Sequence, residues 1–242
     1  MTRWRGAVGA AISLMLSAGL LLGATRGGTA FTTDSARAAD IAAHPVLLPA
    51  SPLVDARSHT QAFTNSSHVT IVDFVYTRCP SMCGTLGGVY QRLQSELVRR
   101  QLTDRVRLLT VSFDPAWDTP ERLRYYEMLM RPDTAVWTIA TLRDSADLQR
   151  VLRSFGVRVI PDGIGGFEHN AALHVVDRTN RLVRIVPIEV SSLDQRAANG
   201  PSAVANDAYD IAISAALAVA DSIAHATDGG VARAVVARRP AP

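Results

Sequence analysis

The pattern of apolar positions along the middle of the chain alternates between two periods. A β-branched and aromatic run at residues 69–76 predicts a central strand, and apolar residues at helical spacing then predict a helix over 80–100. Further strands are predicted at 106–113 and 136–140, and further helices at 145–155 and from a start at Thr119-Pro120-Glu121. Such alternation of strands and helices is typical of an α/β sheet.

The C-terminal part of this pattern closes the sheet. Residues 173–176 and 182–186 flank a polar turn and predict an antiparallel hairpin, which makes the sheet mixed. An Ala-rich stretch at 203–226 predicts a final helix, and the composition of the tail from Asp228 predicts disorder.

The N-terminal part has a targeting pattern. Arg3 and Arg5 precede an uncharged stretch at 6–24, which is longer than the apolar core of about 7–15 residues in a cleavable signal and favours a membrane anchor. Small residues at 28–30 and 36–38 keep signal cleavage open as the alternative. Since the arginines stay in the cytoplasm, the body is expected outside it, on the periplasmic side of the membrane.

These patterns predict four segments. They are a signal peptide or anchor at 1–25, a linker and irregular lead-in at 26–60, the α/β domain at 61–190, and an Ala-rich C-terminal helix with a disordered tail at 191–242.

Composition and charge exclude several classes of function. The 242 residues are 48% hydrophobic and 19% charged, as in one folded domain with tails. The net charge of +3 comes from the tails, because residues 40–227 hold 18 arginines against 20 acidic residues. No basic face remains for a nucleic acid. The chain has no lysine, which excludes Schiff-base and Walker-type chemistry.

Cys79 and Cys83 are the only two cysteines, and they lie at the predicted strand-to-helix turn, on the sheet edge where open α/β folds place their sites. The helix dipole and the neighbouring Arg78 favour thiolate there. A disulfide closing so short a loop would contribute only about 2 kcal/mol, so a purely structural role is the weaker interpretation. Two thiolates can hold copper(I), take part with one histidine in a zinc site, or exchange disulfides.

A third ligand would have to come from six histidines. His169 and His174 lie closest to the predicted hairpin, and strand alternation would direct them to opposite faces, so that at most one approaches the cysteines. The residues alone do not decide between them. The others lie in predicted loops or at a helix end: His44, His59, His68 and His225.

Three segments together resemble the SCO/SenC family, the thioredoxin-like copper chaperones of cytochrome oxidase assembly. They are residues 76–83 (YTRCPSMC), residues 112–121 (SFDPAWDTPE) and Glu168-His169 before a strand. The similarity extends over residues 69–186. It implies a thioredoxin-like fold with a central mixed β-sheet flanked by helices, and copper, as Cu(I), Cu(II) or both, bound by Cys79, Cys83 and His169.

The resemblance also implies a partner and a task. The family delivers copper to the binuclear copper centre of cytochrome c oxidase subunit II, or keeps the cysteines of that subunit reduced, and other copper chaperones are further expected partners. An extracytoplasmic thiol-disulfide oxidoreductase that uses Cys79 and Cys83 is the alternative, so whether the chain is an enzyme stays open. Asp114 and Asp118 match the acidic motif of the family. Two interpretations stay open: the residues end a strand and cap the next helix, or they tune the metal site.

Overall fold

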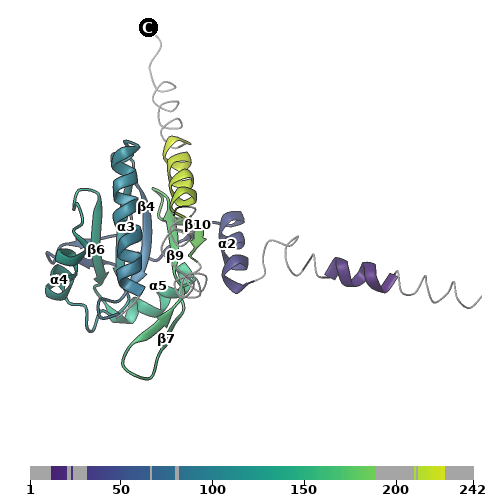
Figure 1. Cartoon of the computed structure of the whole chain (residues 1–242), viewed down its shortest axis with the longest axis horizontal. Coiled ribbons are helices and arrows are strands. Elements are labelled where there is room, and N and C mark those ends of the chain that lie inside the picture. The colour runs from purple at the N-terminus through teal and green to yellow at the C-terminus, as the bar shows by residue number, and fades with distance from the viewer. Residues whose placement is uncertain are drawn as a thin grey trace, which may run out of the picture.

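The computed structural model describes residues 12–20, 23, 32–65, 67–79, 82–188, 210 and 212–226, with the backbone alone at 82–86. Its centre is a sheet with the strand order β1-β10-β9-β4-β5-β6-β2-β3 (Figure 1). The central strands β4, β5 and β6 run parallel, and the remaining pairs are antiparallel. The bounds are β1 (Val46–Leu47), β2 (Leu53–Asp55), β3 (Thr60–Gln61), β4 (Val69–Val75), β5 (Val106–Ser112), β6 (Trp137–Leu142), β9 (Ala172–Val176) and β10 (Arg181–Pro187).

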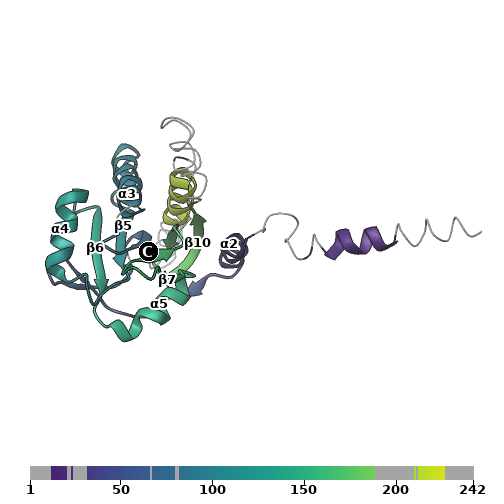
Figure 2. The ribbon, with the colours of Figure 1, turned by 60° about the horizontal axis from the view of Figure 1, so that its bottom comes forward.

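Helices cover both faces of this sheet. The helix α3 (Met82–Arg99) and the helical residues 212–226 lie on one face, and α5 (Leu148–Phe155) lies on the other (Figure 2). Side chains from both helices contact the central strand β4. Tyr90 of α3 donates to the Ile71 carbonyl, and Phe155 of α5 packs on the Phe74 ring. Other described helices are the segment at residues 12–20, α2 (Thr33–Ala43), α4 (Pro120–Met130) and the short η1 (Ser145–Asp147).

The core follows from the predicted patterns. All seven residues of β4 are buried, as a central strand with helices on both faces requires. The buried alanines of the C-terminal helix, among them Ala216 and Ala220, allow its close packing on the domain. The predicted mixed sheet flanked by helices is confirmed, as are its strands, its closing hairpin and the described parts of its helices.

The prediction of a linker and irregular lead-in at residues 26–60 is wrong over much of that length. Residues 33–43 form α2, which Thr32 and Ser35 cap reciprocally, and β1 and β2 pair with the distant strands β10 and β6. Strands of two and three residues are too short to show a period, so their partners in the sheet decide their conformation.

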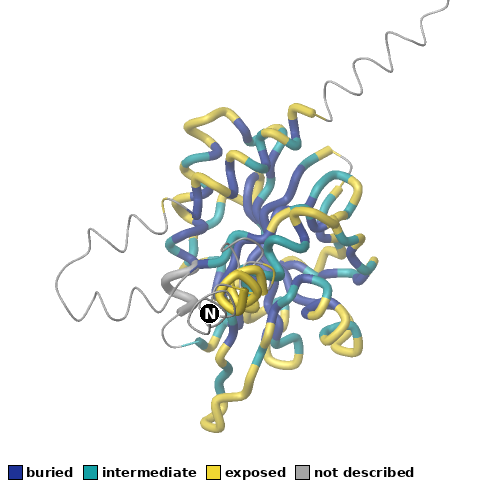
Figure 3. The backbone as a smooth tube through the Cα atoms, turned by 90° about the vertical axis from the view of Figure 1, so that its right-hand side faces the viewer, coloured by how far each residue is buried: buried dark blue, intermediate teal, exposed yellow. Residues whose placement is uncertain are grey.

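The outer segments are described only in part. Residues 12–20 are helical and exposed (Figure 3), and no helix within the described ranges combines the length and the apolar character that a membrane crossing requires. Apart from Gly23, the rest of the predicted signal or anchor lies outside the described residues, as do 189–209 and the tail from 227.

Candidate metal centre

Cys79 lies in the turn between the central strand and α3. The strand β4 ends at Val75, and the Cys79 N–H donates to the Tyr76 carbonyl at 3.2 Å. The Cys79 side chain is half-buried, and Cys83 lies in the first turn of α3, with its side chain outside the described set. The predicted placement of the pair at a strand-to-helix turn is therefore confirmed.

His169 reaches the Cys79 turn from a separate small sheet. It ends β8 (Phe167–His169), which pairs antiparallel with β7 (Val159–Pro161). The ring packs on Phe113 at 5.0 Å between centroids and is 9% exposed. Burial lowers the pKa of His169, and the Asn170 carbonyl and the nearby Cys79 oppose this shift. The His169 ring also lies 6.4 Å, centroid to centroid, from the ring of Tyr76, which precedes Cys79 by three residues.

The two ring nitrogens of His169 have different surroundings. Nδ1 lies 3.3 Å from the Asn170 carbonyl oxygen, to which its N–H can donate. Nε2 is buried and has no hydrogen-bond partner. With the proton on Nδ1, the lone pair of Nε2 stays available, which is the tautomer that a metal-ligating histidine adopts when a carbonyl orients it.

His174 has a different role. It is buried on β9, its Nδ1 lies 3.2 Å from the Val72 carbonyl, and its ring packs edge-on against Phe74 and Phe155. Burial lowers its pKa to about 4. The strand-alternation argument assumed one continuous strand, but His169 and His174 belong to different sheets.

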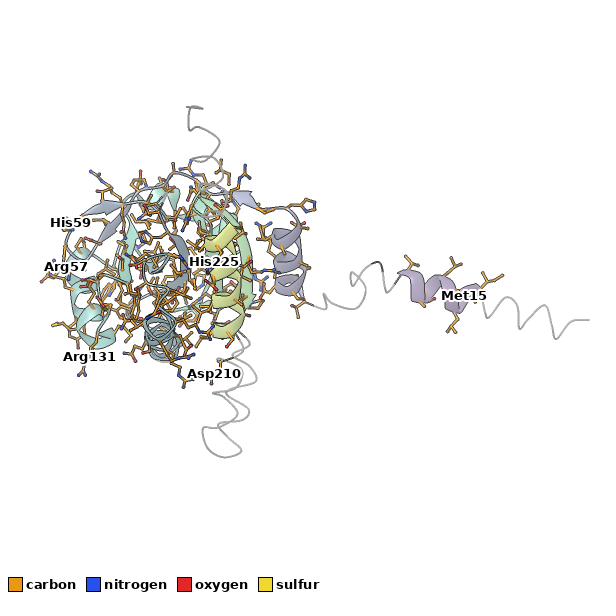
Figure 4. All side chains as sticks on the ribbon, turned by 90° about the horizontal axis from the view of Figure 1, so that it is seen from above. Met15, Arg57, His59, Arg131, Asp210 and His225 are labelled. Carbon is orange, nitrogen blue, oxygen red and sulfur yellow. The ribbon has the colours of Figure 1, made fainter. Side chains whose placement is uncertain are left out.

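The other histidines have partners in their own local segments. Figure 4 shows His59 at the edge of the fold and His225 on the C-terminal helix. His44, His59 and His225 lie against Asp40, Asp55 and Asp221, and His68 lies against Asn65.

Asp118 anchors the turn that carries Cys79. Its fully buried carboxylate accepts hydrogen bonds from the Thr77 N–H at 3.0 Å, from the Thr77 hydroxyl and from the Ser112 hydroxyl. The cap of α4 is Thr119 instead. Asp118 therefore holds the Cys79 turn against the end of β5, a role that the sequence motif marks but does not explain.

Asp114 holds the same turn from its outer side. It accepts two hydrogen bonds from the Arg78 guanidinium, at 2.9 and 3.1 Å. The guanidinium also lies over the Trp117 ring, 4.9 Å from its centroid. The Asp114 carboxylate therefore balances the Arg78 charge beside the Cys79 turn, and the expected effect of Arg78 on the thiolate stays a prediction.

The donor set suits a thiophilic metal. Among the residues with described side chains, no three of the His, Cys, Asp and Glu type come together as a metal cluster, and Cys83 lies outside that set. Within it, the Cys79 side chain and the unpartnered Nε2 of His169 are the candidate donors at this turn. Thiolate and imidazole donors together fit copper or zinc.

Comparisons with known proteins agree with the predicted resemblance. The SCO1/SenC family model matches residues 53–199, more than half of the chain. A search of curated protein sequences found no match.

Several solved structures share the fold. The copper-bound ScoI of Arabidopsis thaliana is 17% identical, with 64% of this chain and 97% of that chain covered and a TM-score of 0.52. BsSco, a member of the Sco family of cytochrome c oxidase assembly proteins, is 18% identical, with 69% and 96% covered and a TM-score of 0.51. Copper-bound yeast Sco1 is 17% identical, with 66% and 92% covered and a TM-score of 0.50.

The structural likeness confirms the predicted thioredoxin-like α/β class. Together with the match of the family model over residues 53–199, it confirms the resemblance that the three motifs predict: this chain belongs to the SCO1/SenC family.

Proposed function

We propose that this chain is a copper chaperone that binds copper through Cys79, Cys83 and His169. The observation that carries the proposal is the buried, unpartnered Nε2 of His169, in a chain of the SCO1/SenC family. The His169 ring packs near Tyr76, whose carbonyl holds the Cys79 N–H. Similar folds are solved with copper bound, in Arabidopsis and in yeast. Two thiolates and one imidazole favour copper(I) over harder ions.

The surrounding residues prepare these donors. Asp118 and Asp114 fix the turn before Cys79 through Thr77 and Arg78. The Asn170 carbonyl holds the His169 ring in the tautomer that leaves Nε2 free to ligate. Because ligation needs deprotonated and reduced thiols, copper affinity should fall at low pH and on oxidation of the pair.

The half-buried position of Cys79 suits transfer of the metal. A partner thiolate or imidazole can approach it from solvent, so copper can pass by exchange of one ligand at a time. The proposed acceptor is the binuclear copper centre of cytochrome c oxidase subunit II, and reduction of the cysteines of that subunit is a related task for the same pair. The pattern of Arg3, Arg5 and residues 6–24 supports a location outside the cytoplasm, tethered to the membrane.

Anaerobic titration of the reduced full chain with copper(I), against a competing chelator, tests the binding proposal. One tight copper per chain is expected, with strong weakening by Cys83→Ser and by His169→Ala. His59→Ala is the matched control, because its exposed side chain pairs with Asp55, and it should bind as the wild type does. Weak binding that does not depend on His169 would overturn the copper site.

The thiol-disulfide oxidoreductase is the second candidate. The location of Cys83 in the first turn of α3, with Cys79 three residues before Met82, supports it, because a helix N-terminus stabilises a reactive thiolate. This activity needs both cysteines but not His169. Disulfide reduction that survives His169→Ala, in a chain that binds copper only weakly, would favour the enzyme.

A further inference from the structure

Tyr76 contacts both of the backbone segments that carry the described donors. Its carbonyl accepts a hydrogen bond from the Cys79 N–H at 3.2 Å. Its hydroxyl reaches Phe167, 91 residues further along the chain. There it donates to the Phe167 carbonyl and accepts from the Phe167 N–H, both at 3.1 Å. One residue thus links the Cys79 turn to the strand that ends at His169.

The ladder between β7 and β8 explains why Phe167 needs this partner. Phe167 lies opposite Pro161, and the adjacent Asp162 donates its N–H to the Gly166 carbonyl at 3.1 Å. Since bonded and non-bonded pairs alternate along an antiparallel ladder, the N–H and C=O of Phe167 point away from β7. In this half-buried position the Tyr76 hydroxyl is the partner of both groups.

The Tyr76 hydroxyl lies close to the Gly166 backbone. A Cβ atom at Gly166 would lie 3.1 Å from the Tyr76 hydroxyl oxygen and would collide with the Asp162 carboxylate. The Tyr76 ring is buried and packs on Phe113 and Phe167, each with centroids 5.3 Å apart. The packing of the ring and the two hydrogen bonds to Phe167 therefore position the hydroxyl.

His169 follows Phe167 by two residues in β8, so the two side chains lie on the same face of the strand. Both rings pack on Phe113, with centroids 5.7 and 5.0 Å from it. A displacement of the Phe167 backbone would therefore carry the imidazole with it.

We propose that Tyr76 is a positioning residue whose hydroxyl fixes the His169 strand to the Cys79 turn and so sets the separation of the imidazole and thiolate donors. The inference rests on the proposed function, because the separation of these donors matters only if both bind one metal ion. Tyr76 itself does not ligate, since its hydroxyl is engaged by the Phe167 backbone.

The variant Tyr76→Phe keeps the ring and removes the hydroxyl. In the full chain we expect copper(I) affinity to fall about tenfold, the lower end of the range for groups that orient a metal ligand. The thiolate-to-copper absorption band of the copper(II) form should also shift. The matched control is Tyr90→Phe, which removes a buried hydroxyl that donates to the Ile71 carbonyl of β4 at 3.0 Å, on the face covered by α3. Equal affinities for the two variants would overturn the proposal.

A double-mutant cycle separates positioning from general destabilisation. If Tyr76 acts through His169, then Tyr76→Phe causes no further loss of affinity in the His169→Ala background. A further tenfold loss in that background would contradict the proposal.

Amide hydrogen exchange gives a readout that does not depend on copper. Tyr76→Phe should speed exchange of the Phe167 amide, which donates to the hydroxyl in the wild type, and Tyr90→Phe should not. If the wild type shows no His169-dependent copper binding, the proposed function fails. Hydrogen exchange then still tests the hydrogen bond between the Phe167 N–H and the Tyr76 hydroxyl. An unchanged Phe167 rate would overturn the positioning role in either case.

Discussion

The carboxylate of Asp118 accepts a hydrogen bond from the Thr77 N–H at 3.0 Å, although the two residues lie 41 positions apart in the chain. Thr77 precedes Cys79 by two residues, and Asp118 follows the end of the neighbouring strand β5. This contact joins two of the three motifs that resemble the family, and it ties the Cys79 turn to a fully buried carboxylate.

Asp118→Asn should loosen this turn. Both carboxylate oxygens of Asp118 accept hydrogen bonds from Thr77 or Ser112. In asparagine an –NH2 group replaces one of these oxygens and cannot accept a hydrogen bond. A loss of about 1–3 kcal/mol of unfolding free energy is expected, the cost of leaving a buried donor unpaired. Urea denaturation measures it. Asp210→Asn, which alters an exposed pair with Arg92, should change stability by less than about 0.5 kcal/mol. Equal effects of the two substitutions would contradict the anchoring role.

Asp73 should make stability depend on pH. It is buried in β4 with Oδ1 unpartnered, and burial raises its pKa from 3.8 to about 7. Because the folded protein holds this proton more tightly than the unfolded chain does, stability attributable to Asp73 is present below pH 3.8 and is lost as the pH rises to about 7. Asp73→Asn should therefore stabilise the protein at pH 8 and have little effect near pH 4, as followed by urea midpoints. An equal effect at both pH values would show that the carboxyl does not titrate in this range.

His174 should have the opposite pH dependence. Its pKa falls from 6.5 to about 4 on folding, so its contribution to stability is present above pH 6.5 and is lost as the pH falls to about 4. His174→Gln keeps an amide donor near the Val72 carbonyl and removes the titration. The variant should lose less stability than the wild type between pH 6.5 and 4, and it should still bind copper. Loss of copper binding in a folded variant would contradict the assignment of His174 to the core.

The N-terminal segment should determine whether the protein is found in the membrane fraction or in the soluble fraction of the cell. If residues 6–24 anchor the chain, the full-length protein stays with membranes until detergent is added. Leu14→Arg combined with Leu16→Arg should release it, because each arginine costs about 2.5–3.5 kcal/mol at the centre of a membrane helix. The control Met128→Arg changes an equally exposed apolar residue of α4 and should leave the distribution unchanged. Wild-type protein in the soluble fraction without detergent would favour a cleaved signal instead.

Local patterns in the sequence predicted the elements that have strong periods or long apolar runs. The strand β4, the helix α3 and the hairpin of β9 and β10 follow from the spacing of their own residues, because burial of a whole strand or of one helix face imposes that spacing. The cysteine pair also stands out locally, since the turn between a central strand and its helix is a place where chemistry occurs.

The tertiary structure decided the contacts between residues far apart in the chain. The short strands β1 and β2 carry no period, and distant partners determine them. The different surroundings of His169 and His174 depend on a break between β8 and β9 that strand alternation does not predict. The Tyr76 hydroxyl and the Asp118 carboxylate meet groups 91 and 41 residues away, and hydrogen bonds at such separations leave no periodic signal in the sequence. The sequence by itself therefore determined the fold class and the donor types, whereas the surroundings of Cys79 and His169 depend on the folded chain.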